Sequence, residues 1–311
     1  MNLKEKLNHY GSIKEPFFFT ISYDLKTWDI IALKDLPSSI SYSINNTSKS
    51  KHVNSLDIST IAFEDYKTMF KEVIKNIEAG NTYLLNLTCQ TLINNQIDLK
   101  EIYESSYAKY KLFYKNEFVS FSPETFVTIN HNKINAFPMK GTINANIHDA
   151  KNKILNDKKE LAEHTMIVDL LRNDLNIVSK NVKVKKFRNI EKISAGKNEL
   201  YQVSSHIQGQ LKENWTDTIG DILIPLLPAG SITGAPKKST LEIIDSIENY
   251  DRNYFTGIWG VYDGISLESS VLIRYIEKEN EKIYYKSGGG ITIDSSCIDE
   301  YNEMLEKIYL P

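Results

Sequence analysis

Residues 117–142 read EFVSFSPETFVTINHNKINAFPMKGT, and this stretch decides the fold class. Residues 117–137 are typical of two strands separated by the turn sequence at residues 130–133, which predicts a β-hairpin. Residues 16–32 also alternate between apolar and polar positions, which indicates further strand. Short strands joined in this way predict antiparallel sheet.

Helical periodicity appears in several other places along the chain. The segment Asp65–Ala79 has apolar residues at helical spacing, and Gly80 marks its end before a strand-like run at residues 83–87. Further helices are predicted at residues 150–175, 239–247 and 298–309, and strands at 182–187, 201–211, 270–277 and 281–285. Because strands and helices do not alternate regularly, we predict an α+β fold and not a doubly wound parallel sheet.

The chain of 311 residues is interpreted as one domain, 1–311, with a short irregular N-terminal part at 1–60. Residues 38–59 are rich in Ser, Asn and Lys, which predicts a loop or linker. The content of 41% hydrophobic and 25% charged residues is typical of a soluble globular protein. A net charge of −3 disfavours nucleic acid as a partner.

Cysteine usage and the N-terminus bear on the compartment. Cys89 and Cys297 are far apart and lie in no metal-binding or disulfide-rich pattern. The first nine residues carry charges where a secretory signal would be apolar, and no stretch approaches the ~20 apolar residues of a membrane span. We therefore expect a cytoplasmic protein with no membrane association.

Three glycine-centred segments could hold an anion. They lie at residues 138–142, 228–237 and 287–291. Glycine lets the backbone approach a ligand closely and exposes amide N–H groups. For any one segment taken alone, a tight turn is the commoner interpretation.

Two pairs of glutamates are spaced i,i+3 in predicted helices, Glu160 with Glu163 and Glu300 with Glu303. This spacing places both carboxylates of a pair on one helix face, where they could share a magnesium ion. The alternative interpretation is a solvated helix face.

Three single residues also have two interpretations. Arg274, in a strand-like run, could bind a carboxylate in a bidentate manner or could lie on an exposed strand face. Glu124, between two strands, could be a general acid if burial raises its pKa, or an ordinary turn residue. Lys140 would be a useful nucleophile only if its pKa is lowered from about 10.4.

Taken together in their order and spacing, seven segments resemble the chorismate-binding enzymes. They are PMKGT (138–142), ELAEHTMIVDLLRNDL (160–175), PAGSITGAPKKSTLEIIDSIE (228–248), GIWGVYD (257–263), IRY (273–275), GGGI (288–291) and EYNEML (300–305). The resemblance extends from about Ile61 to the C-terminus. It implies a magnesium-dependent enzyme built on two packed antiparallel β-sheets with helices outside.

The resemblance also implies roles for individual residues. Glu160, Glu163, Glu300 and Glu303 would surround the magnesium ion that binds the ring carboxylate of chorismate. Arg274 and Tyr262 would engage the enolpyruvyl side. The other substrate-binding positions would be Gly141, Thr142, Thr233, Gly234, Gly289, Gly290 and Lys307.

Two positions point to a branch of the family. Lys140 stands where anthranilate synthases typically have alanine, and it is typical of the aminodeoxychorismate synthases. Leu84 aligns with the water-activating lysine of isochorismate and salicylate synthases, so their base is missing. Relatives in the aminating branches commonly have glutamine at this position.

The implied reaction is amination of chorismate at C4. Lys140 would attack C2 while Glu124 protonates the departing C4 hydroxyl, and ammonia would then add at C4 and expel Lys140. No glutaminase segment is found, so we expect ammonia from solution or from a partner glutamine amidotransferase. The alternatives are anthranilate synthase component I and a non-catalytic subunit that binds chorismate or a glutaminase.

Overall fold

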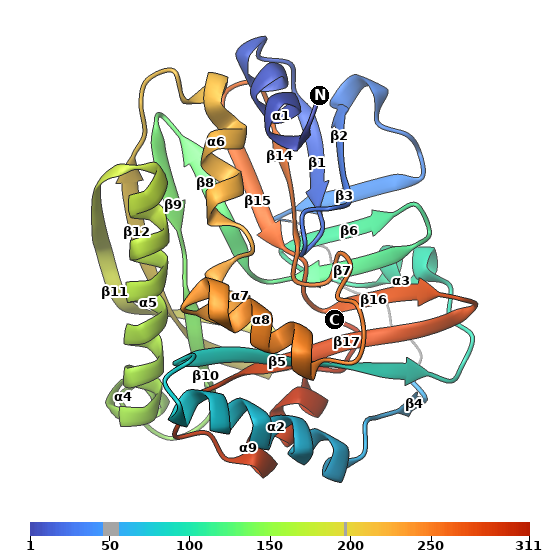
Figure 1. The fold of residues 1–311 in the computed structure, drawn as a ribbon, viewed down its shortest axis with the longest axis vertical. Helices are drawn as coiled ribbons and strands as arrows, with labels where there is room; N and C mark the ends of the chain where they lie inside the picture. The colour runs from blue at the N-terminus through green and yellow to red at the C-terminus, as the bar shows by residue number, and fades with distance from the viewer. Residues whose placement is uncertain (46–55, 196–197) are drawn as a thin grey trace.

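The computed structural model describes residues 1–45, 56–195 and 198–311, and within them the strands form two antiparallel sheets (Figure 1). The nine-stranded sheet has the order β10 (Met139–Asn144), β12 (Asn198–Gln210), β9 (Lys133–Ala136), β8 (Thr125–Asn130), β15 (Leu267–Val271), β14 (Ile258–Tyr262), β1 (Phe17–Ile21) and β2 (Trp28–Ala32), with β11 (Lys180–Ala195) paired to β12. The eight-stranded sheet has the order β13 (Gly234–Ala235), β5 (Leu84–Ile93), β17 (Lys282–Ile291), β16 (Tyr275–Glu279), β7 (Phe118–Ser122), β6 (Tyr110–Tyr114) and β3 (Ile40–Ile44), with β4 (Ile58–Ser59) paired to β5. The predicted fold class is confirmed.

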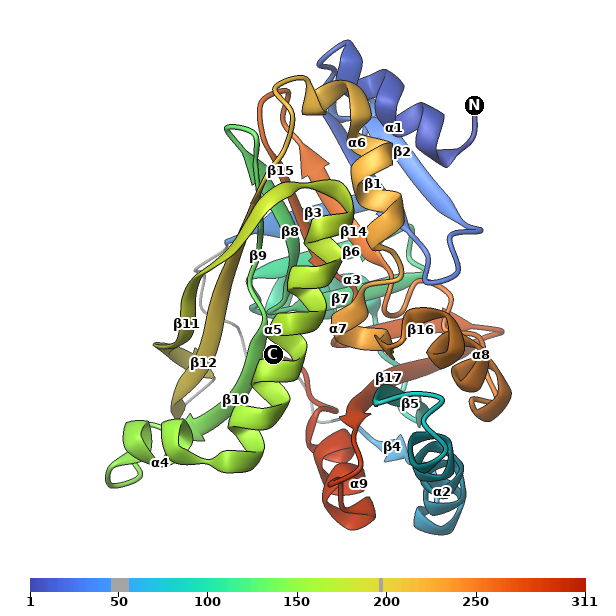
Figure 2. The same cartoon turned by 60° about the vertical axis from the view of Figure 1, so that its left-hand side comes forward.

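Helices cover the outer faces of the sheets (Figures 1 and 2). The long helix α5 (Lys158–Val178) packs on β11 and β12, while α2 (Phe63–Glu78), α8 (Lys237–Ile247) and α9 (Cys297–Glu306) pack around β5 and β17. The remaining helices are α1 (Leu3–Ser12), α3 (Leu99–Ser105), α4 (Ala150–Asn156), α6 (Ile219–Leu223) and α7 (Gly230–Thr233), with short 3₁₀ turns η1 (Leu33–Asp35), η2 (Trp215–Thr218) and η3 (Ile224–Leu226). None of the described helices combines the length and the apolar character needed to cross a membrane.

Strand β1 shows how the core is formed on both faces of one sheet. Phe17 and Phe19 pack in the apolar cluster beneath the helices, whereas Phe18 packs with Trp259 and other aromatic side chains in the cluster near the second sheet. Successive side chains of a strand point to opposite faces. All five residues of β1 are buried because both faces of the strand are covered by other side chains. Burying each phenylalanine contributes roughly 1.5–3 kcal/mol to stability.

Two neighbouring connections carry the chain from one sheet to the other. Pro123 and Glu124 join β7 to β8, and residues 272–274 join β15 to β16. The connections are tied together by hydrogen bonds from Phe121 N to Arg274 O (3.1 Å) and from Val271 N to Glu124 O (3.3 Å). Glu124 and Arg274 are therefore brought to one junction between the sheets.

This junction corrects one prediction. Residues 270–277 were expected to form a single strand, but Arg274 has φ +49° and the segment divides into the end of β15 and the start of β16. A residue in the left-handed region cannot continue a strand, so the chain turns there and enters the other sheet.

Two predicted helices have different limits. The pattern at 150–175 corresponds to α4 and α5, which are separated at Asp157. The Asp157 carboxylate accepts a hydrogen bond from Glu160 N (3.0 Å) and so caps the start of α5. The helix expected to extend to residue 309 ends at Glu306.

The N-terminal part is regular, in contrast to the prediction for residues 1–60. Asn2 caps α1, and both β1 and β2 belong to the nine-stranded sheet. Within the expected loop at 38–59, β3 pairs with β6 and β4 pairs with β5. Pairing with distant strands overrides the polar composition of this segment, whose residues 46–55 lie outside the described part.

Candidate functional site

A pocket opens beside the junction between the sheets and extends to α5 and α9. It brings together most of the residues that the sequence singled out. The predicted residues that line it are Glu124, Lys140, Gly141, Thr142, Glu163, Gly234, Arg274, Gly289, Gly290, Glu303 and Lys307. Leu84 also lines it.

Glu124 is held at the junction by α7. Ser231 Oγ donates a hydrogen bond to Glu124 Oε1 at 2.7 Å. Burial raises the pKa of Glu124, and the hydrogen bond from Ser231 and the positive charge of Arg274 oppose that rise without cancelling it. A carboxyl group with a raised pKa beside a pocket can act as a proton donor near neutral pH.

Arg274 lies on the same side of the pocket with its guanidinium over the ring of Tyr309, 5.6 Å from the ring centroid. Its Nε approaches Tyr309 Oη at 3.5 Å. Among the described residues, no carboxylate lies within ion-pair distance of this guanidinium. Arg274 is thus available to bind an anionic ligand in a bidentate manner.

Lys140 lies where the pocket reaches α5 and forms an ion pair with Glu163 (Nζ to Oε2, 2.7 Å). Burial alone would lower the pKa of Lys140, but the Glu163 carboxylate outweighs burial and the pKa is raised. A nucleophilic lysine needs a lowered pKa, so with Glu163 as its partner Lys140 is a bound cation. Neighbouring Gly141 has φ +86°, and a Cβ there would lie 2.7 Å from Glu160 Oε2.

Lys307 lies on the α9 side and has two partners. Its Nζ contacts Glu303 Oε1 at 2.8 Å and donates a hydrogen bond to Gly288 O at 2.8 Å. Burial lowers the pKa of Lys307, and Glu303 partly opposes this shift. The bond to Gly288 places this cation beside the glycine run at the end of β17.

The four predicted metal-binding glutamates remain in two groups. Within the described residues, no three His, Cys, Asp or Glu side chains lie close enough to hold a metal ion. Glu160 Oε2 is nevertheless buried without a hydrogen-bond partner, and burial raises the pKa of both Glu160 and Glu300. A buried carboxylate oxygen that lacks a partner suits a hard cation, so the chemistry of Glu160 fits magnesium.

Residues 21–310 match the model of the chorismate binding enzyme family. The chain belongs to this family. The match begins well before Ile61, where the recognisable motifs start, because β2, β3 and the segments around them are included.

Individual relatives agree with the family assignment. The chain is 47% identical to an uncharacterized PabA-like protein of Haemophilus influenzae over 99% of this chain and 95% of that protein. It is 32% identical to aminodeoxychorismate synthase component 1 of Bacillus subtilis over 79% of this chain, and spans 54% of that longer protein. The crystal structure of anthranilate synthase component I from Streptococcus pneumoniae superposes with a TM-score of 0.69 at 25% identity, covering 84% of this chain and 60% of that one.

Four positions implied by the family resemblance are absent from the pocket lining, namely Glu160, Glu300, Tyr262 and Thr233. Tyr262 is fully buried, donates a hydrogen bond to Gly264 O (2.9 Å) and packs on Phe17 in the core. Its expected contact with substrate is corrected, because Tyr262 is on the core face of β14. Thr233 is also buried and donates a hydrogen bond to Ala229 O (3.0 Å) within α7.

Several pocket residues were not predicted. Ser231 lies within a glycine-rich segment that had been noted, and Asn86 and Thr88 follow Leu84 at the two-residue spacing of one strand face. That spacing could have identified the two β5 residues once Leu84 was placed in the site. Phe255 and Thr256 reach the pocket from the loop before β14, for which the sequence contains no comparable signal.

Proposed function

We propose that this chorismate-binding enzyme aminates chorismate at C4 and so forms 4-amino-4-deoxychorismate. The observation that carries the proposal is that Lys140 and Glu124 line one pocket with Arg274 and Lys307. A nucleophile and an acid are thereby combined with two cations that suit the two carboxylates of chorismate. The similarity to an aminodeoxychorismate synthase component supports this reaction.

In the proposed reaction Lys140 Nζ forms a bond to C2 of the ring. Both conjugated double bonds of the ring shift, the C4–oxygen bond breaks, and Glu124 protonates the departing hydroxyl so that water leaves. Ammonia then adds at C4, both double bonds shift back, the bond between C2 and Nζ breaks, and a proton from the added nitrogen returns to the Glu124 carboxylate. Lys140 is released and no external oxidant is needed.

Lys140 must be uncharged when it attacks, which imposes a requirement on Glu163. Their ion pair of 2.7 Å favours the ammonium form, so Glu163 has to take another partner during the reaction. The donor set of Glu160, Glu163, Glu300 and Glu303 would hold magnesium, which would supply positive charge for the ring carboxylate of the substrate.

We propose that the ammonia comes from a partner glutamine amidotransferase subunit or from solution, and that the reaction takes place in the cytoplasm. A non-catalytic subunit that binds chorismate or a glutaminase is disfavoured, because binding alone has no need of both Lys140 and Glu124.

A second candidate is anthranilate synthase component I, which is favoured by the structural similarity to the Streptococcus pneumoniae protein. An assay with chorismate, magnesium and ammonium separates the two reactions. We expect 4-amino-4-deoxychorismate, identified by its mass and by conversion to para-aminobenzoate on addition of a lyase. Fluorescent anthranilate formed without a lyase would overturn the proposal.

A further inference from the structure

Strand β5 has an open edge where it lines the pocket. One edge of β5 pairs with β17 from Leu85 to Ile93. On the other edge, β13 pairs only with Leu84 and Leu85, and β4 pairs only with Leu92 and Ile93. The segment between these partners contains Asn86 and Thr88, whose side chains line the pocket.

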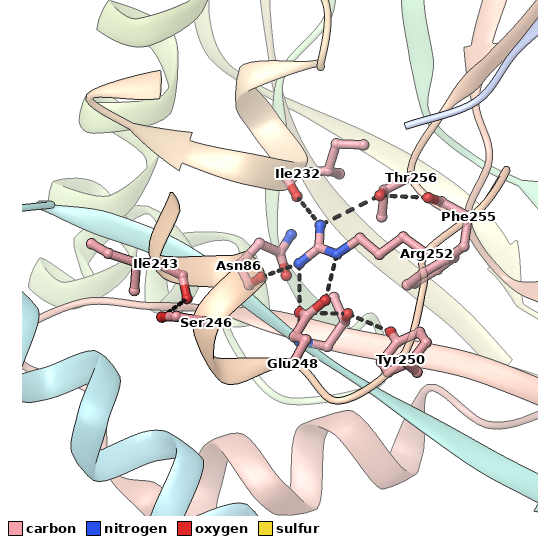
Figure 3. Close-up of polar contacts among 10 residues, drawn as sticks. Asn86, Ile232, Ile243, Ser246, Glu248, Tyr250, Arg252, Phe255 and Thr256 are labelled. Carbon is pink, nitrogen blue, oxygen red and sulfur yellow. Dashed lines mark hydrogen bonds and ion pairs between the residues drawn. The ribbon is translucent and has the colours of Figure 1, made fainter. Parts of the chain in front are cut away.

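A buried ion pair fills this gap (Figure 3). Arg252 Nη2 donates to Asn86 O at 2.8 Å, and Glu248 Oε1 accepts from Thr88 N at 2.9 Å. Arg252 and Glu248 are themselves joined by two bonds, Nε to Oε2 at 2.7 Å and Nη2 to Oε1 at 2.6 Å. The two side chains thus satisfy one donor and one acceptor of β5, as a neighbouring strand would.

Arg252 also holds two other residues that line the pocket. Arg252 Nη1 lies 3.4 Å from both Ile232 O and Thr256 Oγ1, and Ile232 and Thr256 also line the pocket. The Arg252 and Glu248 side chains are only 2% and 3% exposed, so water cannot replace these bonds. The planar guanidinium fork suits such fixed, divergent acceptors, which a lysine could not satisfy together.

Thr88 belongs to this network and lies between the pocket and a second cavity. Its Oγ1 donates to Glu248 Oε1 at 2.7 Å and contacts Tyr250 Oη at 2.6 Å. Thr88 lines both the pocket and a second cavity that includes Cys89, Gln90 and Tyr284. Displacement of Thr88 would therefore alter the wall that separates the pocket from the second cavity.

We infer that the Glu248–Arg252 pair is a positioning element for the reaction, which replaces a missing strand beside β5 and holds the Asn86–Thr88 wall of the pocket in place. Neither residue lines the pocket, so both act through the groups that they hold. The inference rests on the proposed function only in assuming that chemistry on chorismate occurs in this pocket.

The test compares Arg252→Lys with the wild-type protein and with Asp29→Asn. Asp29 accepts hydrogen bonds from Tyr114 and Lys115 at the edge strand β2 and does not line the pocket. Chorismate consumption with magnesium and ammonium gives kcat and KM per folded molecule. Hydrogen exchange is measured by mass spectrometry on peptides that cover residues 84–90.

We expect Arg252→Lys to lower kcat by about 10- to 100-fold, because small displacements in a site are costly, and to change KM by less than about threefold, since Arg274 and Lys307 are untouched. Exchange at residues 84–90 should accelerate. Asp29→Asn should keep kcat and KM within about twofold and leave this exchange unchanged. A kcat for folded Arg252→Lys within twofold of wild type would overturn the inference.

Thr88→Val provides an answer if Arg252→Lys does not fold. It removes the hydroxyl bonds to Glu248 and Tyr250 but keeps the backbone N–H bond, so a fall in kcat of about three- to tenfold is expected. An unchanged kcat in that variant would also overturn the inference. If the wild-type protein consumes chorismate without C4 amination, the proposed function fails, and the comparison of kcat and hydrogen exchange among the variants remains valid.

Discussion

The two ends of the pocket are held in different ways. At the junction end, Glu124 and Arg274 lie on two strand connections that are tied together by backbone hydrogen bonds. At the helix end, Lys140 and Lys307 are held by ion pairs to Glu163 and Glu303. The junction end is fixed by sheet pairing and presents an arginine with no carboxylate partner in the described chain. At the helix end, each of these two lysines is neutralised by one glutamate. The fold therefore prepares the junction end for substrate, while the lysines of the helix end must exchange partners before Lys140 can react.

The largest expected effect comes from breaking the helix end at Lys140. Lys140→Ala should reduce formation of the aminated product by about 10³-fold or more, because it removes the proposed nucleophile. Magnesium-dependent binding of chorismate, measured by calorimetry, should be largely retained.

Lys159→Ala is the matched control for this variant. Lys159 also approaches Glu163, at 3.8 Å, but it is half exposed and does not line the pocket. Its activity should stay within about twofold of wild type. Normal amination by Lys140→Ala would rule out the covalent mechanism.

At the junction end, Glu124→Gln removes the proposed general acid. This change keeps the shape of the side chain and removes the proton that it donates, so kcat should fall by about 10²- to 10³-fold with little change in KM. Initial rates at several chorismate concentrations measure both quantities. A variant that retains more than a tenth of wild-type kcat would remove Glu124 from the role of acid.

The helix end is also expected to set the response of stability to acid. His164 follows Glu163 on α5, is fully buried against Ser205 (Nε2 to Oγ, 2.6 Å), and burial lowers its pKa to about 4. Because this pKa lies below the ordinary value of 6.5, the unfolded chain binds the proton more readily, and stability present above pH 6.5 is lost as pH falls toward 4. The loss should reach at most about 3 kcal/mol.

Urea unfolding at pH 7 and pH 5 measures this effect. His164→Gln should weaken the dependence of the free energy of unfolding on pH. His148→Gln, at an exposed position of the loop before α4, should leave that dependence unchanged. If the free energy of unfolding changes equally between pH 7 and pH 5 in the His164 variant and the wild type, other residues cause the loss of stability in acid.

A change at Ser231, which contacts Glu124 at the junction end, should have the smallest effect. Ser231→Ala removes the hydrogen bond that stabilises the Glu124 carboxylate, so the already raised pKa of Glu124 should rise further, by less than about one unit. Since the acid acts when protonated, the fall in kcat at alkaline pH should move to higher pH. If the fall in kcat moves to lower pH instead, it does not reflect the titration of Glu124.

Much of the fold followed from local pattern. Strand alternation around residues 117–137 predicted antiparallel sheet, and the carboxylate and glycine motifs predicted that Lys140, Glu163, Gly289 and Glu303 would belong to one site. The misplacement of Tyr262 has a simple cause, because a motif shows which strand carries a side chain but not which face that side chain occupies in the packed sheet. The division of residues 270–277 between two sheets was equally hidden from local pattern.

The class of fold, the family and the chemical groups of the site could be predicted from residue order alone, because strand period, glycine runs and carboxylate spacing are local properties. Packing of the sheets was needed to show that Arg274 lies at a junction without a carboxylate partner among the described residues, that Lys140 is bound by Glu163, and that Glu248 and Arg252 replace a strand beside β5. These features join residues far apart in the chain. They depend on burial and on which partners remain within reach, and those quantities exist only after the two sheets have packed.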